Sequence, residues 1–183
     1  MAKNILIITG SARKGGNTDL LAEAFLRGAK EAGHEVHKFE SAVDTVEGCL
    51  ACDTCWGKDK PCSFDDGFDK LSPMLEKADL LVLCSPLYWY TLSAQIKAAI
   101  DKFYSYMVAK SPTKLKFKET MLLMCAEDDT PGAFDGAVGT YKAIGAYLNV
   151  ADRGMLLIPG VHAKGDIHQT DALVRAEKMG AEI

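Results

Sequence analysis

Residues 4–18 read NILIITGSARKGGNT, a continuous apolar run followed by a loop rich in glycine and basic residues. Continuous rather than alternating apolarity is typical of a strand buried on both faces of a parallel sheet. Apolar positions from Leu20 to Ala32 then repeat at helical spacing, and Gly33 provides a stop signal. The stretch therefore predicts a strand, a tight loop and a helix in succession.

This alternation continues along the chain. Three further continuous apolar runs lie at residues 80–84, 121–125 and 155–158, and a weaker, alternating run at residues 35–39 predicts an edge strand. Helical periods cover residues 66–77, 96–107, 132–149 and 171–181. Pro73 predicts that the first of these is kinked or begins at Ser72.

Five strands alternating with five helices predict an α/β fold, a doubly wound, five-stranded parallel sheet with helices on both faces. Right-handed crossovers leave few topologies, and the flavodoxin-like strand order 2-1-3-4-5 fits best. Residues 1–183 are expected to form one such domain. Its ligand site should lie at the carboxyl ends of the central strands.

Composition excludes several function classes. The chain is 48% hydrophobic and 25% charged, as expected of an ordinary globular protein. Its net charge of −4 and the lack of a Lys/Arg stripe argue against a nucleic-acid partner or an anionic membrane surface. Because the N-terminus also lacks a signal-peptide pattern, we expect a cytoplasmic protein.

The loop after the first strand has the features of an anion site. Gly10, Gly15 and Gly16 allow a tight turn and close approach to a ligand, and the helix that follows offers free N–H groups. Candidate donors are Ser11, Arg13, Asn17 and Thr18. The spacing matches neither G-x-x-x-x-G-K-[ST] nor G-x-G-x-x-G, so a single phosphate monoester is the expected ligand. The alternative is a helix-capping turn that binds nothing.

Two more loops should reach the same sheet edge. Residues 85–91, SPLYWYT, offer an aromatic wall for a flat isoalloxazine ring, and residues 126–132 approach from the other side. The candidate contacts are Pro86, Leu87, Tyr88, Trp89, Ala126 and Glu127. Alternatively, the aromatic residues belong to the core or to an interface, and the acidic residues cap a helix.

Four segments together resemble the NAD(P)H-dependent FMN reductase family, including its iron–sulfur flavoproteins: GSARKGGNT (10–18), PCSFDDGFDKL (61–71), SPLYWYTLSAQIKAAIDKFY (85–104) and GDIHQTDALVRAEKMG (165–180). The resemblance implies a flavodoxin-like fold, tightly bound FMN, NAD(P)H as electron donor and a homodimer or homotetramer. It also implies that residues 11, 13, 17 and 18 hold the phosphate and residues 86–89 line the flavin.

Four of the six cysteines form the pattern Cys49-x2-Cys52-x2-Cys55-x6-Cys62. Their thiolates could converge on a [4Fe–4S] cluster or on tetrahedral zinc. The motif resembles the ligand set of the iron–sulfur flavoproteins. Free thiols in a protein that carries FMN alone are an equally weighted alternative, and a labile disulfide is another. Cys84 and Cys125 end apolar runs and are expected to be small buried hydrophobes.

These features favour an oxidoreductase that moves electrons from NAD(P)H through FMN to a quinone, flavin, metal or dye-like acceptor. No catalytic residue is assigned, because the cofactor carries the chemistry. The alternatives are an electron carrier that links ferredoxin-like partners to FMN through a cluster, and a non-catalytic FMN- or zinc-binding module. The four histidines are expected at the surface, and Asp101 and Lys102 are expected to form a solvated pair.

Overall fold

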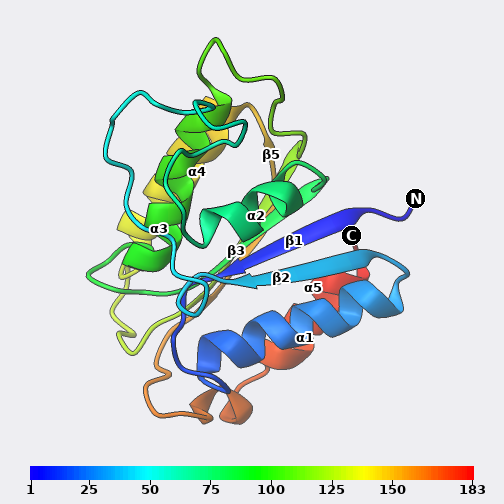
Figure 1. The fold of residues 1–183 in the computed structure, drawn as a ribbon. Coiled ribbons are helices and arrows are strands. Elements are labelled where there is room, and N and C mark those ends of the chain that lie inside the picture. Colours follow the sequence, from blue (N-terminus) through cyan, green and yellow to red (C-terminus); the bar gives the residue numbers. More distant parts are fainter.

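The computed structural model describes residues 1–183. A five-stranded sheet in the order β2-β1-β3-β4-β5 forms its centre (Figure 1). The strands are β1 (Asn4–Thr9), β2 (Glu35–Glu40), β3 (Leu80–Pro86), β4 (Glu119–Cys125) and β5 (Ala151–Ile158). All neighbouring pairs are parallel, which confirms the predicted topology and places the strands' carboxyl ends along one edge.

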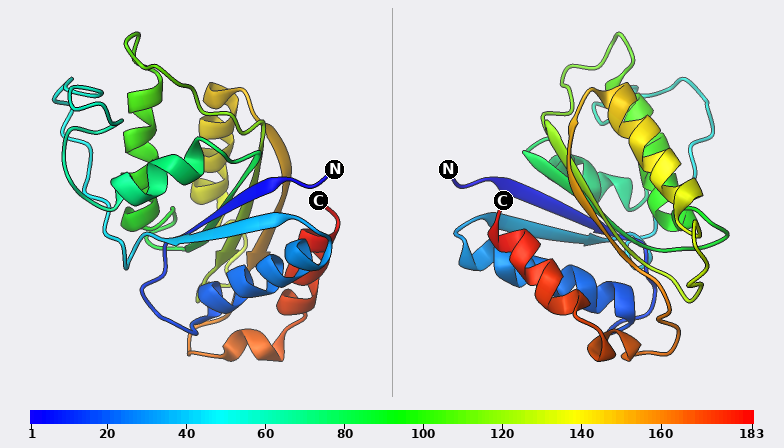
Figure 2. Two further views of the ribbon diagram at one scale, coloured as in Figure 1. Left: turned by 45° about the vertical axis from the view of Figure 1, so that its right-hand side comes forward. Right: turned by 180° about the vertical axis from the view of Figure 1, so that it is seen from behind.

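Helices cover both faces of the sheet (Figure 2). One face carries α1 (Asn17–Glu31) and α5 (Ala172–Ala181), and the other carries α2 (Phe68–Leu75), α3 (Ala94–Asp101) and α4 (Asp135–Leu148). There are also two 3-10 helices: η1 (Lys102–Tyr106) directly follows α3, and η2 (Asp166–Gln169) lies between β5 and α5. Buried apolar clusters of 21 and 20 residues fill the two sides, so the sheet is buried on both faces as its continuous apolar runs predict.

Several boundaries differ from the predictions. Pro73 lies inside α2, which begins at Phe68, so the alternative start at Ser72 is wrong. The apolar stripe from Ile96 to Met107 is divided between α3 and η1. Strand β5 begins at Ala151, four residues before its apolar run, because its first residues are exposed and carry no hydrophobic signal. None of the helices has the length and apolar character needed to cross a membrane.

Candidate functional site

The loop after β1 leads directly into the amino end of α1. The first backbone hydrogen bond into this helix runs from the Leu20 N–H to the Gly16 carbonyl, at 2.9 Å. The N–H groups of Asn17 and Thr18 precede it and have no intrahelical partner. They lie at the positive end of the helix dipole, where an anion is favoured. The backbone thus offers the free N–H groups that the predicted phosphate site requires.

Hydrogen bonds within the loop fix its shape. Gly15 adopts a left-handed φ of 65°, and its N–H donates to Asp19 Oδ2 at 2.7 Å. Gly10 packs against the start of α3, where a Cβ atom would lie 2.1 Å from Ser93 Oγ. That hydroxyl is buried and has no hydrogen-bond partner in the chain. Glycine at these two positions is therefore a requirement of the loop.

The carboxylate of Asp19 is held by a buried lysine. Lys38 Nζ donates to Asp19 Oδ1 at 2.5 Å and to Glu23 at 2.6 Å, and the side chains of Lys38 and Asp19 are each under one-tenth exposed. Burial alone would raise the pKa of Asp19, but the hydrogen bonds from Lys38 and Gly15 bring it below its ordinary value. Asp19 is therefore ionised and shapes the loop.

The side chain of Asn17 is committed to another segment. Its Nδ2 donates to the Ala163 carbonyl at 2.9 Å, and its Oδ1 accepts the N–H groups of Gly165 and Ile167 at 3.1 and 3.3 Å. This leaves the backbone N–H as the group that Asn17 can offer to a phosphate. The amide instead ties the phosphate loop to the loop after β5.

One cavity of about 200 Å³ opens beside the phosphate loop. Of the eleven residues expected to bind the cofactor, all but Trp89 line it: Ser11, Arg13, Gly16, Asn17, Thr18, Pro86, Leu87, Tyr88, Ala126 and Glu127. Three loops that are distant in sequence are thus brought together by the parallel sheet. Unpaired helix N–H groups and an exposed arginine suit the phosphate of FMN, and Pro86, Leu87 and Tyr88 offer an apolar surface for its ring.

The loop after β5 also contributes, which the sequence reasoning missed. Val161 and His162 line the same cavity, and His162 Nδ1 lies 2.9 Å from Glu127 Oε2. His162 is an exposed loop residue, as expected of the histidines, with a side chain that is two-thirds exposed, but its place beside the cavity was not predicted. Its position directly after the fifth parallel strand is the signal that could have placed it at this edge.

Trp89 lies at the tip of a strained turn. Tyr88 and Thr91 exchange both backbone hydrogen bonds at 3.1 Å, while Trp89 and Tyr90 between them have φ angles of 47° and 62°. Turns with two left-handed residues prefer Asn-Gly, so two aromatic residues are costly here. The Trp89 side chain is 94% exposed. Such strain is concentrated at ligand-binding positions.

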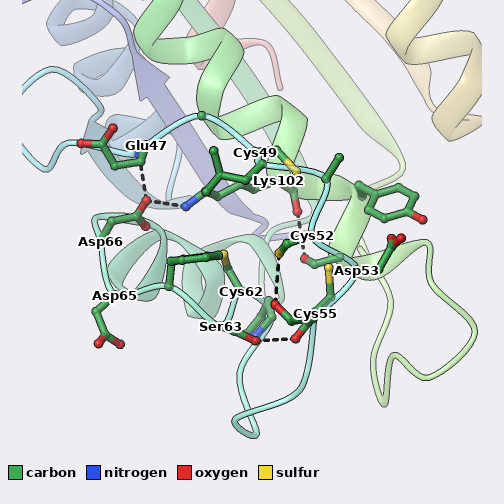
Figure 3. A pocket seen from close by; sticks show the side chains of 18 residues that line it. Glu47, Cys49, Cys52, Asp53, Cys55, Cys62, Ser63, Asp65, Asp66 and Lys102 are labelled. Atoms are coloured by element: carbon green, nitrogen blue, oxygen red, sulfur yellow. Dashed lines mark hydrogen bonds and ion pairs between the residues drawn. The ribbon is translucent and has the colours of Figure 1, made fainter.

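The cysteine segment, residues 47–66, lies between β2 and α2 without any helix or strand of its own. It surrounds a second cavity of about 400 Å³, and all four clustered cysteines line it (Figure 3). None of them forms a disulfide; Cys49 and Cys52 are exposed, and Cys55 and Cys62 are half-buried. The spacing therefore does gather the four side chains around one pocket.

The backbone of this segment is unusual. Four non-glycine residues, Ala51, Asp53, Trp56 and Asp59, have φ angles between 50° and 61°. A left-handed conformation costs roughly 1–2 kcal/mol for each such residue. The segment accepts this strain between consecutive cysteines, which is typical of backbone that is shaped for a ligand.

The thiols are near one another but do not form a closed coordination site. Burial raises the pKa of Cys55, and the neighbouring Cys49, Cys52 and Cys62 raise it further. The Thr54 hydroxyl, 3.1 Å from Cys52 Sγ, lowers the pKa of Cys52. No three His, Cys, Asp or Glu side chains reach metal-binding geometry, so the expected convergence on one centre extends only to a shared pocket. Four thiolates repel one another, and metal–sulfur bonds supply the free energy that draws them together.

The other two cysteines lie in the core. Cys84 and Cys125 are buried at the ends of β3 and β4. Burial raises the pKa of Cys125 to about 12 and that of Cys84 well above its ordinary value. They pack as small hydrophobes, as expected.

A family model described as NADPH-dependent FMN reductase matches residues 3–140. Among curated proteins, an "Iron-sulfur flavoprotein" of Archaeoglobus fulgidus is 28% identical over 188 residues, covering 96% of this chain and 76% of that protein. An "Iron-sulfur flavoprotein" of Methanosarcina thermophila is 35% identical over 95 residues, which is 52% of this chain and about half (49%) of that protein.

Solved structures share the fold at low sequence identity. An NAD(P)H:quinone oxidoreductase from Methanothermobacter marburgensis has a TM-score of 0.76 at 18% identity, covering 100% of this chain and 96% of that one. An azoreductase from Bacillus anthracis has a TM-score of 0.70 at 21% identity over the full length of both chains. These likenesses confirm the flavodoxin-like architecture.

Proposed function

Because the chain belongs to the NADPH-dependent FMN reductase family, we propose that it binds FMN beside the phosphate loop and transfers electrons from NAD(P)H to a second acceptor. The observation that carries the proposal is the cavity at which ten of the expected cofactor-binding residues meet. FMN supplies hydride acceptance and the return of electrons singly or in pairs, whereas the protein supplies binding, orientation and electrostatics.

Each part of the chain then has a defined task. The N–H groups of Asn17 and Thr18 would bind the phosphate, and Arg13, which lines the cavity without a carboxylate partner, would add a charge-assisted hydrogen bond. Pro86, Leu87 and Tyr88 would support the ring, with Trp89 and Tyr90 at its edge. Ala126 and Glu127 would approach from the opposite loop. No side chain is needed as a general acid or base.

The test is oxidation of NADH and NADPH by the FMN-loaded protein with a quinone, free flavin, a ferric chelate or an azo dye as acceptor. Turnover with at least one acceptor is expected. Absence of nucleotide oxidation with every acceptor would refute the oxidoreductase proposal.

A second candidate is an iron–sulfur flavoprotein that relays electrons between a ferredoxin-like partner and FMN. It is favoured by the strained cysteine segment and by the likeness to the Archaeoglobus fulgidus protein along 96% of this chain. Four thiolates of Cys49, Cys52, Cys55 and Cys62 would hold a [4Fe–4S] cluster. Rapid reduction by ferredoxin, with negligible reduction by NADH or NADPH, would favour this function over the first.

We also propose a homodimer or homotetramer. An apolar groove of about 360 Å³ runs between η1 and α4 and includes Phe103, Tyr104, Ile144 and Tyr147. Tyr147 is 77% exposed, and with its apolar neighbours it forms the kind of exposed patch that marks protein–protein interfaces. Light scattering coupled to size exclusion should give at least twice the 19.8 kDa chain mass.

A further inference from the structure

The most buried ion pair of the chain lies in the wall of the cysteine pocket. Lys102, the first residue of η1, donates to Asp66, and their side chains are only 4% and 6% exposed. The expectation of a solvated Asp101–Lys102 pair is therefore wrong, since Asp101 pairs with Lys97 instead. Desolvation offsets much of the attraction in such a pair, so its presence calls for a role besides stability.

Asp66 closes the cysteine segment at its base. Its Oδ2 also accepts the Glu47 N–H at 2.8 Å, and its Oδ1 accepts the Phe68 N–H at 2.8 Å. Glu47 precedes the first clustered cysteine, and Phe68 begins α2 after the last one. One carboxylate thus joins the two ends of the segment, and Lys102 fastens that junction to η1 (Figure 3).

The middle of the segment rests on the same short helix. Trp56 Nε1 donates to the Ser105 carbonyl at 2.7 Å, and its ring meets Tyr106 edge-on at 5.9 Å between centroids. Lys102 and Ser105 also line the cavity that the four cysteines share. The segment is therefore fixed to η1 at its base and at its centre, with the cysteines on the stretches between these points.

We propose that the Lys102–Asp66 pair positions the cysteine segment for a thiophilic metal centre. This inference rests on the proposed cysteine-bound metal. Lys102 is a positioning residue, because it acts through Asp66 on the backbone that carries the thiols. Its buried ammonium also places a positive charge in the wall of a pocket that must accept several thiolates. Removing the pair should loosen the geometry of the ligands while leaving the phosphate loop unchanged.

The experiment titrates Co²⁺ into reduced, metal-free, full-length protein and follows the thiolate-to-cobalt absorption. Residues that orient metal ligands typically contribute about 10- to 100-fold in affinity, and Lys102→Met should weaken Co²⁺ binding by that factor. The absorption spectrum of the Co²⁺-loaded Lys102→Met variant should indicate fewer thiolate ligands than that of the wild type. The affinity of this variant for FMN should be unchanged. Lys97→Met is the matched control. It removes the lysine of the exposed Lys97–Asp101 ion pair in the adjacent helix α3, and this variant should bind Co²⁺ as the wild type does.

The double variant Asp66→Asn/Lys102→Met leaves no unpaired buried charge and guards against misfolding of the single variant. It should show the same loss of affinity. Wild-type Co²⁺ affinity and spectrum in the folded variants would overturn the positioning role alone. Failure of the wild type to bind Co²⁺ would instead remove the metal centre itself, while the FMN-dependent activity could stand.

Discussion

The phosphate loop and the cysteine segment both follow carboxyl ends of neighbouring strands, yet they are built differently. The phosphate loop is seven residues long between β1 and α1 and is tied to the sheet, to α1 and to the β5 loop by short hydrogen bonds. The cysteine segment is longer, contains no regular structure and carries four left-handed residues. The first site is formed by the fold, whereas the second, as proposed above, would depend on a bound metal for its final shape.

The largest effect is expected in the cysteine segment. If the four cysteines hold the proposed [4Fe–4S] cluster, Cys55→Ser removes one of its thiolate ligands, so bound iron should fall from about four atoms per chain to less than one. Iron and sulfide analysis of anaerobically purified protein provides the measurement. Cys84→Ala, in the core, is the control and should retain its iron. Full iron content in Cys55→Ser would contradict the assignment.

At the phosphate loop, the expected effect is a loss of protein stability. Asn17→Ala removes three hydrogen bonds to the loop at residues 163–167 and leaves their backbone groups, among them the buried N–H of Ile167, without this partner. The free energy of unfolding in urea should fall by about 3 kcal/mol. Asn17→Asp keeps the two acceptor contacts and should lose less. Equal stability of Asn17→Ala and the wild type would show that this tie does not hold the loop.

The strands of the sheet and the loops around the FMN cavity could be predicted from the sequence. Continuous apolar runs such as residues 4–9 and 80–84 identified buried parallel strands, and the parallel topology then determined that loops at residues 10–18, 85–91 and 126–132 share one edge. Ten residues of the cavity followed from that rule and from residue chemistry.

The remaining features depend on tertiary contacts that have no local signal. His162 carried only the positional signal of following the predicted strand at residues 155–158, and Asn17 turns its amide toward residues nearly 150 positions away. Asp101 and Lys102 are adjacent charged residues at the end of one apolar stripe, and nothing in the sequence distinguishes their burial. The change from α3 to η1 directs Lys102 inward and leaves Asp101 exposed. The left-handed backbone at residues 51–59 has little local signal, because none of those four residues is glycine or asparagine and only Asp53 and Asp59 are of a type that tolerates this conformation.

A smaller effect is expected at Arg13, whose side chain lines the cavity and is exposed. Arg13→Ala removes a charge-assisted hydrogen bond to the FMN phosphate, so the dissociation constant for FMN should rise about 10- to 100-fold with little change in stability. Fluorescence quenching during FMN titration gives the constant. The neighbouring Lys14→Ala is a suitable control, because Lys14 pairs with Glu40. An unchanged constant for Arg13→Ala would place the phosphate elsewhere.

The smallest effect concerns strain in the aromatic turn. Replacing Trp89 and Tyr90 by Asn and Gly provides the residues that a turn with two positive φ angles prefers, and the free energy of unfolding should rise by about 1 kcal/mol. Nucleotide oxidation should decrease, since the exposed aromatic edge is lost. Ala51→Gly should give a similar gain in the cysteine segment. Lower stability of the turn variant would mean that the aromatic side chains stabilise the fold itself.

The most direct test of the account is an anaerobic titration of FMN-reconstituted protein with NADPH, and in parallel with NADH, while the visible flavin absorption is recorded. The account predicts that FMN binds stoichiometrically and that at least one nucleotide bleaches its absorption band. Failure to retain FMN, or a bound flavin that dithionite reduces but neither nucleotide does, would contradict it.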